Sequence, residues 1–367
     1  MYLIVDAHQD LAWNMLTFNR DYTRSAEQTR LEEKDSQAPK VNGDTLLGWP
    51  EYQHGNVAVI FATLFAAPAR ARSGEWDTQC YADQNQAGEL YGAQLDSYER
   101  LEEDNPTKFQ RIRNLTDLES VLAAWQEKQD MEENTIGRPT GLLLLMEGAE
   151  CVREPAELEE WWKRGVRIIG PAWLGNRFCG GTREPGPLTS QGYELLEAMA
   201  DLGFILDLSH MDRAAVLEAL DFYPAAIAAT HSNAAALLKG ALGNRHLPDD
   251  VIQGIIDRDG VIGIVPFNYF LVPEWSARDT RLTVSLESVV AHIDHICQIA
   301  GDAYHVGIGS DFDGSFGLGS TPVGIDSIAD LQKLVPLLGE KGYTEDHIAS
   351  ILANNWLRLI KTTLPEK

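Results

Sequence analysis

Short apolar runs rich in Leu, Ile and Val recur along the chain, separated by longer segments with helical periodicity. The runs show little polar alternation, so both faces of each predicted strand are apolar. Strands of this kind are typical of a parallel sheet that helices cover on both sides. Eight such runs occupy residues 3–5, 56–62, 141–146, 166–169, 204–208, 226–230, 261–265 and 305–309.

The segments between the runs predict crossover helices, and residues 192–199 and 286–293 are good examples. Eight strand–helix units in one chain predict an α/β protein built as a closed (β/α)8 TIM barrel. The length of 367 residues is large for an ordinary domain but within the range of such barrels. We therefore interpret residues 1–367 as a single barrel catalytic domain.

Two connections are longer than a barrel needs. Residues 81–133 are helical but strongly polar, and we interpret them as an insertion of paired outer helices with a mobile link near Asn105 and Pro106. Residues 18–54 are interpreted as a long loop after the first strand. Long loops on a barrel often cover the substrate side.

Composition and charge exclude several classes of protein. With 44% hydrophobic and 23% charged residues, the chain is typical of a globular protein, and no apolar run approaches the length of a membrane span. The net charge of −25 argues against nucleic-acid binding, because a phosphate backbone is bound by clusters of Lys and Arg. We see no secretory signal, and the four cysteines lack C-x-x-C spacing, so we expect reduced thiols and a cytoplasmic protein.

Side chains that can bind metal follow five of the eight runs. The carboxyl ends of barrel strands meet at one mouth, so we expect these side chains to lie together. They are His8 and Asp10 after the first run, Glu147 after the third, Asp207 and His210 after the fifth, His231 after the sixth, and Asp311 and Asp313 after the eighth. By contrast, His292, His295 and His347 lie in helical patterns and are interpreted as surface or packing residues.

Imidazoles and carboxylates together suit zinc or a similar divalent ion, and a bridging carboxylate allows two ions to activate one shared hydroxide. By chain position, His8 and Asp10 would bind one ion, and His210 and His231 the other, with Glu147 as the bridge. The pattern therefore predicts two divalent ions, zinc by preference, and a hydrolytic reaction.

The same segments resemble the membrane (renal) dipeptidase family of zinc-dependent peptidases. The resemblance spans nearly the whole chain. The matching elements are residues 6–11 with Trp13, residues 147–148, residues 165–167, residues 188–189 with Gly192, residues 202–210, residues 230–233, Arg245 with residues 248–250, and residues 305–314.

The resemblance implies that a metal-bridging hydroxide cleaves the peptide bond of dipeptides. The implied metal ligands are His8, Asp10 and Glu147 at one zinc, and Glu147, His210 and His231 at the other. Asp311 matches the family's catalytic aspartate, which passes a proton from the bridging water to the leaving amine. Arg245 matches the arginine that binds the substrate's C-terminal carboxylate, a bidentate role that a planar guanidinium suits.

The chain departs from the family after the fourth run. Trp173 occupies the place of a histidine that contacts the substrate carbonyl, while the nearby Asn176 still matches the family's substrate-binding stretch. An indole N–H donates one hydrogen bond but carries no charge. Either Arg177 or the second metal ion covers the oxyanion instead, or the substrate differs from an ordinary dipeptide.

Three hypotheses follow for function. The first is a dipeptidase acting on a small substrate with a free carboxylate. The second is a related metal-dependent hydrolase of another amide or ester, such as an N-acyl amino acid or a lactone. The third is a non-catalytic barrel that acts as a binding protein. Because members of the family are often dimers, the resemblance also implies a homodimer.

Overall fold

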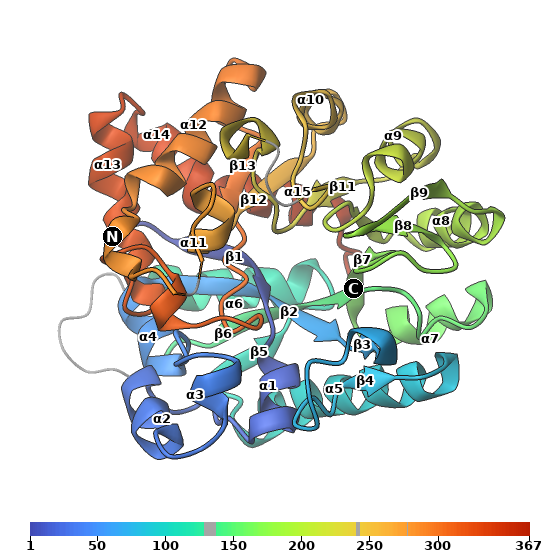
Figure 1. Ribbon diagram of the computed structural model, residues 1–367, viewed down its shortest axis with the longest axis horizontal. Coiled ribbons are helices and arrows are strands. Elements are labelled where there is room, and N and C mark those ends of the chain that lie inside the picture. Colours follow the sequence, from blue (N-terminus) through green and yellow to red (C-terminus); the bar gives the residue numbers. More distant parts are fainter. Residues whose placement is uncertain (128–136, 240–242, 277) are drawn as a thin grey trace.

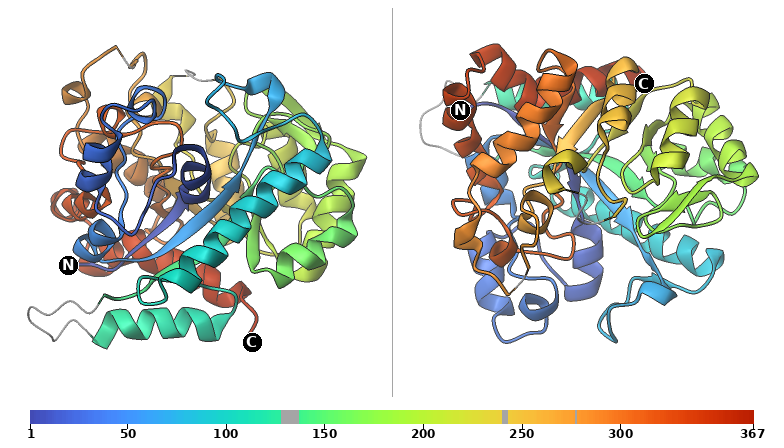
Figure 2. Two further views of the ribbon diagram at one scale, coloured as in Figure 1. Left: turned by 90° about the horizontal axis from the view of Figure 1, so that it is seen from below. Right: turned by 45° about the horizontal axis from the view of Figure 1, so that its top comes forward.

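The computed structural model describes residues 1–127, 137–239, 243–276 and 278–367. Its centre is a barrel of eight parallel strands surrounded by helices (Figures 1 and 2). The barrel strands are β1 (Ile4–Gln9), β2 (Val57–Phe65), β6 (Thr140–Glu147), β7 (Val166–Gly170), β10 (Ile205–Asp207), β11 (Ile227–Ala229), β12 (Val261–Ile264) and β13 (Val306–Ile308). Each predicted run overlaps one of these strands, so the prediction of a (β/α)8 barrel is confirmed.

Two strand pairings close the barrel. The first strand pairs with the last through Asp6 and Ile308, and β2 pairs with β6 over seven residues that end at Phe65 and Glu147. The carboxyl ends of all eight strands therefore meet in one ring, which is the condition for the predicted side chains to converge.

Successive side chains of a strand point to opposite faces, so each barrel strand can contribute to two hydrophobic cores, one inside the barrel and one under the helices. On β6, Leu143 and Leu145 pack in a cluster with residues from strands across the barrel, whereas Leu142 and Leu144 pack in the larger cluster that includes the helices. Residues of strands on opposite sides of a closed barrel can meet only inside it. The next residue on the inner face of β6 after Leu145 is Glu147, at the mouth.

The helices that surround the strands are largely the predicted crossovers. Residues 192–199 lie in α8 and residues 286–293 lie in or next to α12, as expected. The helices are α1 (Leu11–Phe18), α2 (Ala26–Glu33), α3 (Ala38–Val41), α4 (Trp49–Gly55), α5 (Gln84–Asp104), α6 (Leu115–Glu127), α7 (Leu158–Lys163), α8 (Ser190–Leu202), α9 (Arg213–Phe222), α10 (Asp249–Asp257), α11 (Asn268–Leu271), α12 (Glu287–Ala300), α13 (Leu334–Glu340), α14 (Glu345–Ala349) and α15 (Asn355–Thr363).

Helices α5 and α6 fall in the predicted insertion, and between them lies a strand that the sequence did not indicate. The link near Asn105 leads into β5 (Phe109–Arg111), which pairs in parallel with the first part of β6. Three residues are too few to show a period of two, so this strand left no signal in the sequence. The end of the predicted insertion, residues 128–133, lies outside the described residues.

The prediction of a long loop over residues 18–54 is wrong in detail, since the segment contains α2, α3 and α4. These helices are polar or short and therefore give little hydrophobic periodicity. One signal was present, because Ser25 caps α2 by accepting a hydrogen bond from the Gln28 backbone N–H at 3.1 Å. In Figure 1, α1, α2 and α3 lie together in the lower part of the molecule.

Two further strand pairs lie outside the barrel. A parallel pair joins β3 (Ala67–Pro68) to β4 (Cys80–Tyr81), and a hairpin joins β8 (Cys179–Gly181) to β9 (Glu184–Leu188). The four cysteines are all free thiols, as expected. Among the helices of the described residues, none combines the length and apolar character that crossing a membrane requires.

Candidate metal centre and substrate cavity

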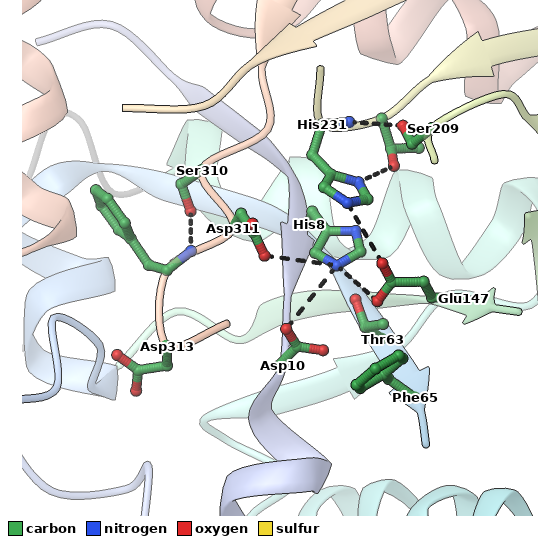
Figure 3. Close-up of polar contacts among 12 residues, drawn as sticks. His8, Asp10, Thr63, Phe65, Glu147, Ser209, His231, Ser310, Asp311 and Asp313 are labelled. Atoms are coloured by element: carbon green, nitrogen blue, oxygen red, sulfur yellow. Dashed lines mark hydrogen bonds and ion pairs between the residues drawn. The ribbon is translucent and has the colours of Figure 1, made fainter. Parts of the chain in front are cut away.

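The predicted metal ligands converge at the mouth of the barrel. His8 lies near the end of β1, Glu147 is the last residue of β6, and His231 follows β11 by two positions. Figure 3 shows these side chains pointing toward one another, with Asp10 and Asp311 beside them. The strand ends bring together residues that are more than three hundred positions apart in the sequence.

One group of ligand atoms faces Glu147 Oε2. His8 Nε2 lies 3.5 Å from this oxygen and 4.0 Å from Asp10 Oδ2. Both ring nitrogens of His8 and Oδ1 of Asp10 are buried, and none has a hydrogen-bond partner among the described residues. Buried polar atoms without partners are costly, and a cation bound by the three side chains would satisfy His8 Nε2 and the Asp10 carboxylate.

A second group faces the other oxygen of the same carboxylate. Glu147 Oε1 lies 2.9 Å from His210 Nε2 and 3.4 Å from His231 Nε2, and the two imidazole nitrogens are 2.9 Å apart. The two oxygens of Glu147 thus face two different ligand groups. A carboxylate placed in this way can bridge two ions.

Asp311 lies at the edge of both groups. Its Oδ1 is 3.9 Å from His8 Nε2, and ligand atoms of Asp311, His8 and His231 lie within 4.8 Å of one another. Asp311 has a left-handed backbone with φ of 56°, and His210 has φ of 65°. Such strain in side chains larger than glycine is tolerated where the surrounding structure requires a particular orientation.

Threonine hydroxyls orient two of the imidazoles. The Thr230 hydroxyl donates to Asp207 Oδ2 at 2.6 Å and lies 3.0 Å from His231 Nδ1, so it accepts the proton of that nitrogen. Thr182 Oγ1 lies 2.9 Å from His210 Nδ1. With Nδ1 protonated, the lone pair of each ring is on Nε2, which faces the centre, as metal-ligating histidines require.

Burial sets the protonation states of the centre. Desolvation raises the pKa of Glu147 to about 8 and that of Asp10 to about 7, and it lowers the pKa values of His210 and His231 well below their usual range. His210 and His231 are therefore neutral and ready to bind a cation, while without a cation Glu147 is mostly protonated and Asp10 partly protonated at neutral pH. The donor set and its burial fit divalent metal ions.

A cavity of about 520 Å³ opens over the centre. Asp10, Glu147, His210 and Asp311 form its polar floor, and the remaining walls are largely aromatic. The aromatic lining residues are Trp13, Phe65, Trp173, Phe267, Tyr269 and Phe270.

Arg245 lies in the wall of this cavity, where the resemblance expects a carboxylate-binding arginine. It is buried, and its guanidinium donates to the Ser232 hydroxyl at 3.1 Å and to the His231 carbonyl at 2.9 Å. Its Nε has no hydrogen-bond partner among the described residues. Arg245 is thus a fixed cation next to the metal ligands.

Trp173 also lines the cavity. Its ring packs edge to face against the ring of Phe65, with 5.2 Å between the two ring centroids. The centroid of the His210 ring lies 6.2 Å away. At the position where the resemblance expects a histidine, Trp173 contributes an aromatic wall beside the candidate metal ligand His210.

The structure places Asn176 and Arg177 away from this cavity. The Asn176 amide donates to the Pro171 carbonyl at 2.8 Å and accepts from the Phe178 N–H at 2.9 Å, which shapes the loop after β7. The Arg177 guanidinium lies over the ring of Phe178 and donates to the Val152 carbonyl. Neither residue lines the cavity, so Arg177 is not available to an oxyanion there.

The sequence predicted that Asp313 lies at a strand end but did not indicate its structural role. Asp313 is fully buried and accepts hydrogen bonds from Arg20 (3.0 Å), Tyr22 (2.8 Å), Thr45 (2.5 Å) and the Leu46 N–H (3.0 Å). All four donors come from the segment between α1 and α4. We call this group the Asp313 clamp, and it fixes that segment next to the turn that carries Asp311.

An eight-stranded parallel barrel with this ligand cluster at its carboxyl mouth defines a metal-dependent barrel hydrolase. The chain belongs to the membrane dipeptidase family, peptidase family M19, whose family model matches residues 1–365. It is a metal-dependent peptidase of the dipeptidase class. This membership, with all the predicted ligands in place, leaves no support for a non-catalytic barrel.

Two curated relatives match part or nearly all of the chain. The chain is 34% identical over 218 residues to an uncharacterized protein of the pqqA 5′ region in Klebsiella pneumoniae, covering 57% of this chain and 76% of the relative. It is 23% identical over 365 residues to the dipeptidase aclJ of Aspergillus oryzae, covering 97% of this chain and 77% of the relative.

Solved structures share the fold over the full length. A metallopeptidase from Rhodobacter sphaeroides, liganded with a phosphinate mimic of the dipeptide L-Ala-D-Ala, is 23% identical with a TM-score of 0.76. A structure described as the dipeptidase AC is 22% identical with a TM-score of 0.78. Each comparison covers 99% of both chains.

Proposed function

We propose that this protein hydrolyses the peptide bond of dipeptides with two divalent ions, zinc by preference. The observation that carries the proposal is the position of Glu147, whose two oxygens face two separate groups of ligand atoms at 2.9–3.5 Å. His8 and Asp10 would hold one ion, and His210 and His231 the other. When bound, such a pair supplies a water nucleophile at neutral pH and polarises the substrate carbonyl.

The other residues of the cavity would position the substrate and move its protons. Arg245 would bind the C-terminal carboxylate, because its guanidinium is buried, fixed and beside the metal ligands. Asp311 Oδ1 lies close to His8, so it would accept the proton of the attacking water and deliver it to the leaving amine. Trp173 and Phe65 would exclude water from the side of the cavity next to His210.

The test is hydrolysis of a panel of L,L and L,D dipeptides by zinc-loaded protein. We expect cleavage that a chelator abolishes and that added zinc restores, together with two bound ions per chain. Protein that carries two ions but cleaves no dipeptide would contradict the proposal.

The variant Asp311→Asn tests the proton transfer separately. The amide keeps the size of the side chain but cannot accept the proton, so we expect kcat to fall by about 10²–10⁴ with metal content retained. Full activity with both ions bound would place the proton transfer on another group.

A second candidate function is hydrolysis of another carboxylate-bearing amide or ester, such as an N-acyl amino acid or a lactone. Trp173 favours it, since an aromatic ring stands where the family has a histidine that contacts the substrate carbonyl. The Arg245 match opposes it, although an N-acyl amino acid would still present a free carboxylate to this arginine. The same panel, extended to N-acetyl amino acids, distinguishes the two candidate functions.

The homodimer that the family resemblance implies stays a prediction, and analytical ultracentrifugation would test it.

A further inference from the structure

Arg183 forms part of the cavity wall, and no role has been assigned to it so far. It lies in the turn of the hairpin between β8 and β9. Among the described residues that line the cavity, Arg183 and Arg245 are the two arginines, and the wall has no lysine. The cavity thus contains a second permanent positive charge besides the one assigned to the substrate carboxylate.

The Arg183 guanidinium has no partner within the described part of the chain. Its side chain is exposed and makes no hydrogen bond or ion pair there, although the protein has a net charge of −25. The neighbouring residue is different, since Glu184 is paired with Arg70 at 2.7 Å. An unpaired arginine on a cavity wall, in so acidic a protein, is available to an anionic ligand.

The backbone of Arg183 is held in place. Its φ of 64° is left-handed, a conformation that favours glycine or asparagine. Its N–H donates to Asn244 Oδ1 at 2.9 Å, and the amide of Asn244 donates to the Gly181 carbonyl (2.9 Å) and to Asp212 (2.7 Å). The turn is therefore fixed to the loop that carries Arg245.

The neighbours of Arg183 define which part of a substrate it meets. Thr182, the preceding residue, contacts the metal-ligand candidate His210, and Asn244, which binds the Arg183 backbone, directly precedes Arg245. Arg183 thus lies on the same wall as Arg245. Groups near the carboxylate that Arg245 binds are the groups that come within reach of Arg183.

We propose that Arg183 is a specificity-determining residue that binds a second carboxylate, in the side chain of the substrate's C-terminal residue. The preferred substrates are then dipeptides that end in glutamate or aspartate. The proposal rests on the proposed dipeptidase function and on Arg245 as the site of the C-terminal carboxylate. The new part of the proposal is the chemical class of the C-terminal residue, which hydrolysis releases as a free amino acid.

The test compares Ala-Glu with Ala-Gln, in the L,L and L,D forms, on zinc-loaded protein. The two side chains have the same shape and differ in charge. We expect kcat/KM to favour Ala-Glu by about 2- to 5-fold, the effect of one exposed ion pair. Arg183→Gln should bring this ratio close to one, and Arg183→Lys should retain part of it.

The control variant is Lys361→Gln, which removes one positive charge from an exposed site on α15, a helix that contributes no residue to the cavity. It should keep the ratio of the unmodified protein. An equal loss in Lys361→Gln would show a general effect of net charge and would overturn the role of Arg183. A ratio near one in the unmodified protein would do the same.

Calorimetric binding of free glutamate and free glutamine, which are products and need no turnover, provides an independent measurement. We expect glutamate to bind about 2- to 5-fold more tightly and Arg183→Gln to remove the difference. If neither dipeptide is cleaved but glutamate is still preferred through Arg183, the dipeptidase function fails while the carboxylate site remains. If dipeptides are cleaved without preference in either measurement, only the role of Arg183 fails.

Discussion

Glu147 is the residue on which both halves of the candidate metal centre depend. Its Oε2 faces His8 and its Oε1 faces His210 and His231, and the side chain is almost completely buried. No other carboxylate among the described residues belongs to both of these ligand groups. Loss of its charge should therefore affect two ions and not one.

We predict that Glu147→Gln weakens binding of both ions by at least about 10-fold, because a neutral amide presents only one weak oxygen ligand. Metal content after dialysis, measured by atomic emission, checks this. The matched control is Glu150→Gln, since Glu150 pairs with Arg177 outside the cavity and should not affect metal content. Retention of two ions in Glu147→Gln would remove the bridging role.

Metal binding should release protons at neutral pH. In the metal-free protein, burial raises the pKa of Glu147 to about 8 and that of Asp10 to about 7, so below these values the carboxyl groups must lose a proton before they bind a cation. His210 and His231, whose pKa values burial lowers, add no such competition. We expect metal affinity to rise with pH up to about 8 and then to level off.

Calorimetry in buffers of different ionisation enthalpy measures this release. The number of protons released at pH 7 should be larger than at pH 9, and it should fall in Glu147→Gln. An affinity that is constant between pH 6 and pH 8 would contradict the assignment of these carboxylates as ligands.

At the scale of single residues, the sequence predicted the positions of some side chains of the site and not of others. The ligand positions follow from topology, because the strands that precede His8, Glu147 and His231 must end at one mouth. Asn176 and Arg183 lie in loops, where no periodicity defines the direction of a side chain. Matching to a family placed Asn176 near the substrate, whereas its amide is occupied by hydrogen bonds within its own loop.

At the scale of elements, the segment from α1 to α4 is an addition that hydrogen bonds attach to the turn at the barrel mouth. Its polar helices gave little hydrophobic signal, and three residues of β5 were too few to recognise, whereas the eight apolar barrel strands were all predicted. What fixes this segment is the Asp313 clamp. Arg20 is almost completely buried and also pairs with Glu33, so the clamp is a buried ionic network.

We predict that Asp313→Ala lowers the free energy of unfolding by about 3–5 kcal/mol, because it leaves buried donors and the Arg20 charge without their acceptor. Urea denaturation measures the loss. The control is Asp326→Ala, which removes an exposed partner of Arg281 and should cost at most about 1 kcal/mol. Equal losses in the two variants would show that the clamp contributes no more than a surface pair.

At the scale of the whole molecule, the metal centre joins strands from both ends of the chain. His8 lies near the end of the first strand, Asp10 follows that strand and Asp311 follows the last one. The Asp311 N–H donates to the His8 carbonyl at 3.1 Å. A cation bound there stabilises the closed barrel, since it binds the folded protein and not the unfolded chain.

We predict that removal of metal lowers the Tm and that the Tm then rises with zinc concentration. A ligand at 1,000 times its Kd adds about 4 kcal/mol to the free energy of unfolding. Differential scanning calorimetry with and without chelator checks this, and Glu147→Gln, as the control, should respond little. An identical Tm with and without metal would mean that no ion bridges the strands.

The pairing of β1 with β13 also has a consequence for the time at which the enzyme becomes active during its synthesis. His8 and Asp10 are translated before the partners that complete their site, and the last of these, Asp311, follows His8 by more than 300 residues. A nascent or prematurely terminated chain thus has no complete centre. Metal loading, and with it peptide cleavage, is confined to chains whose translation has passed the eighth strand.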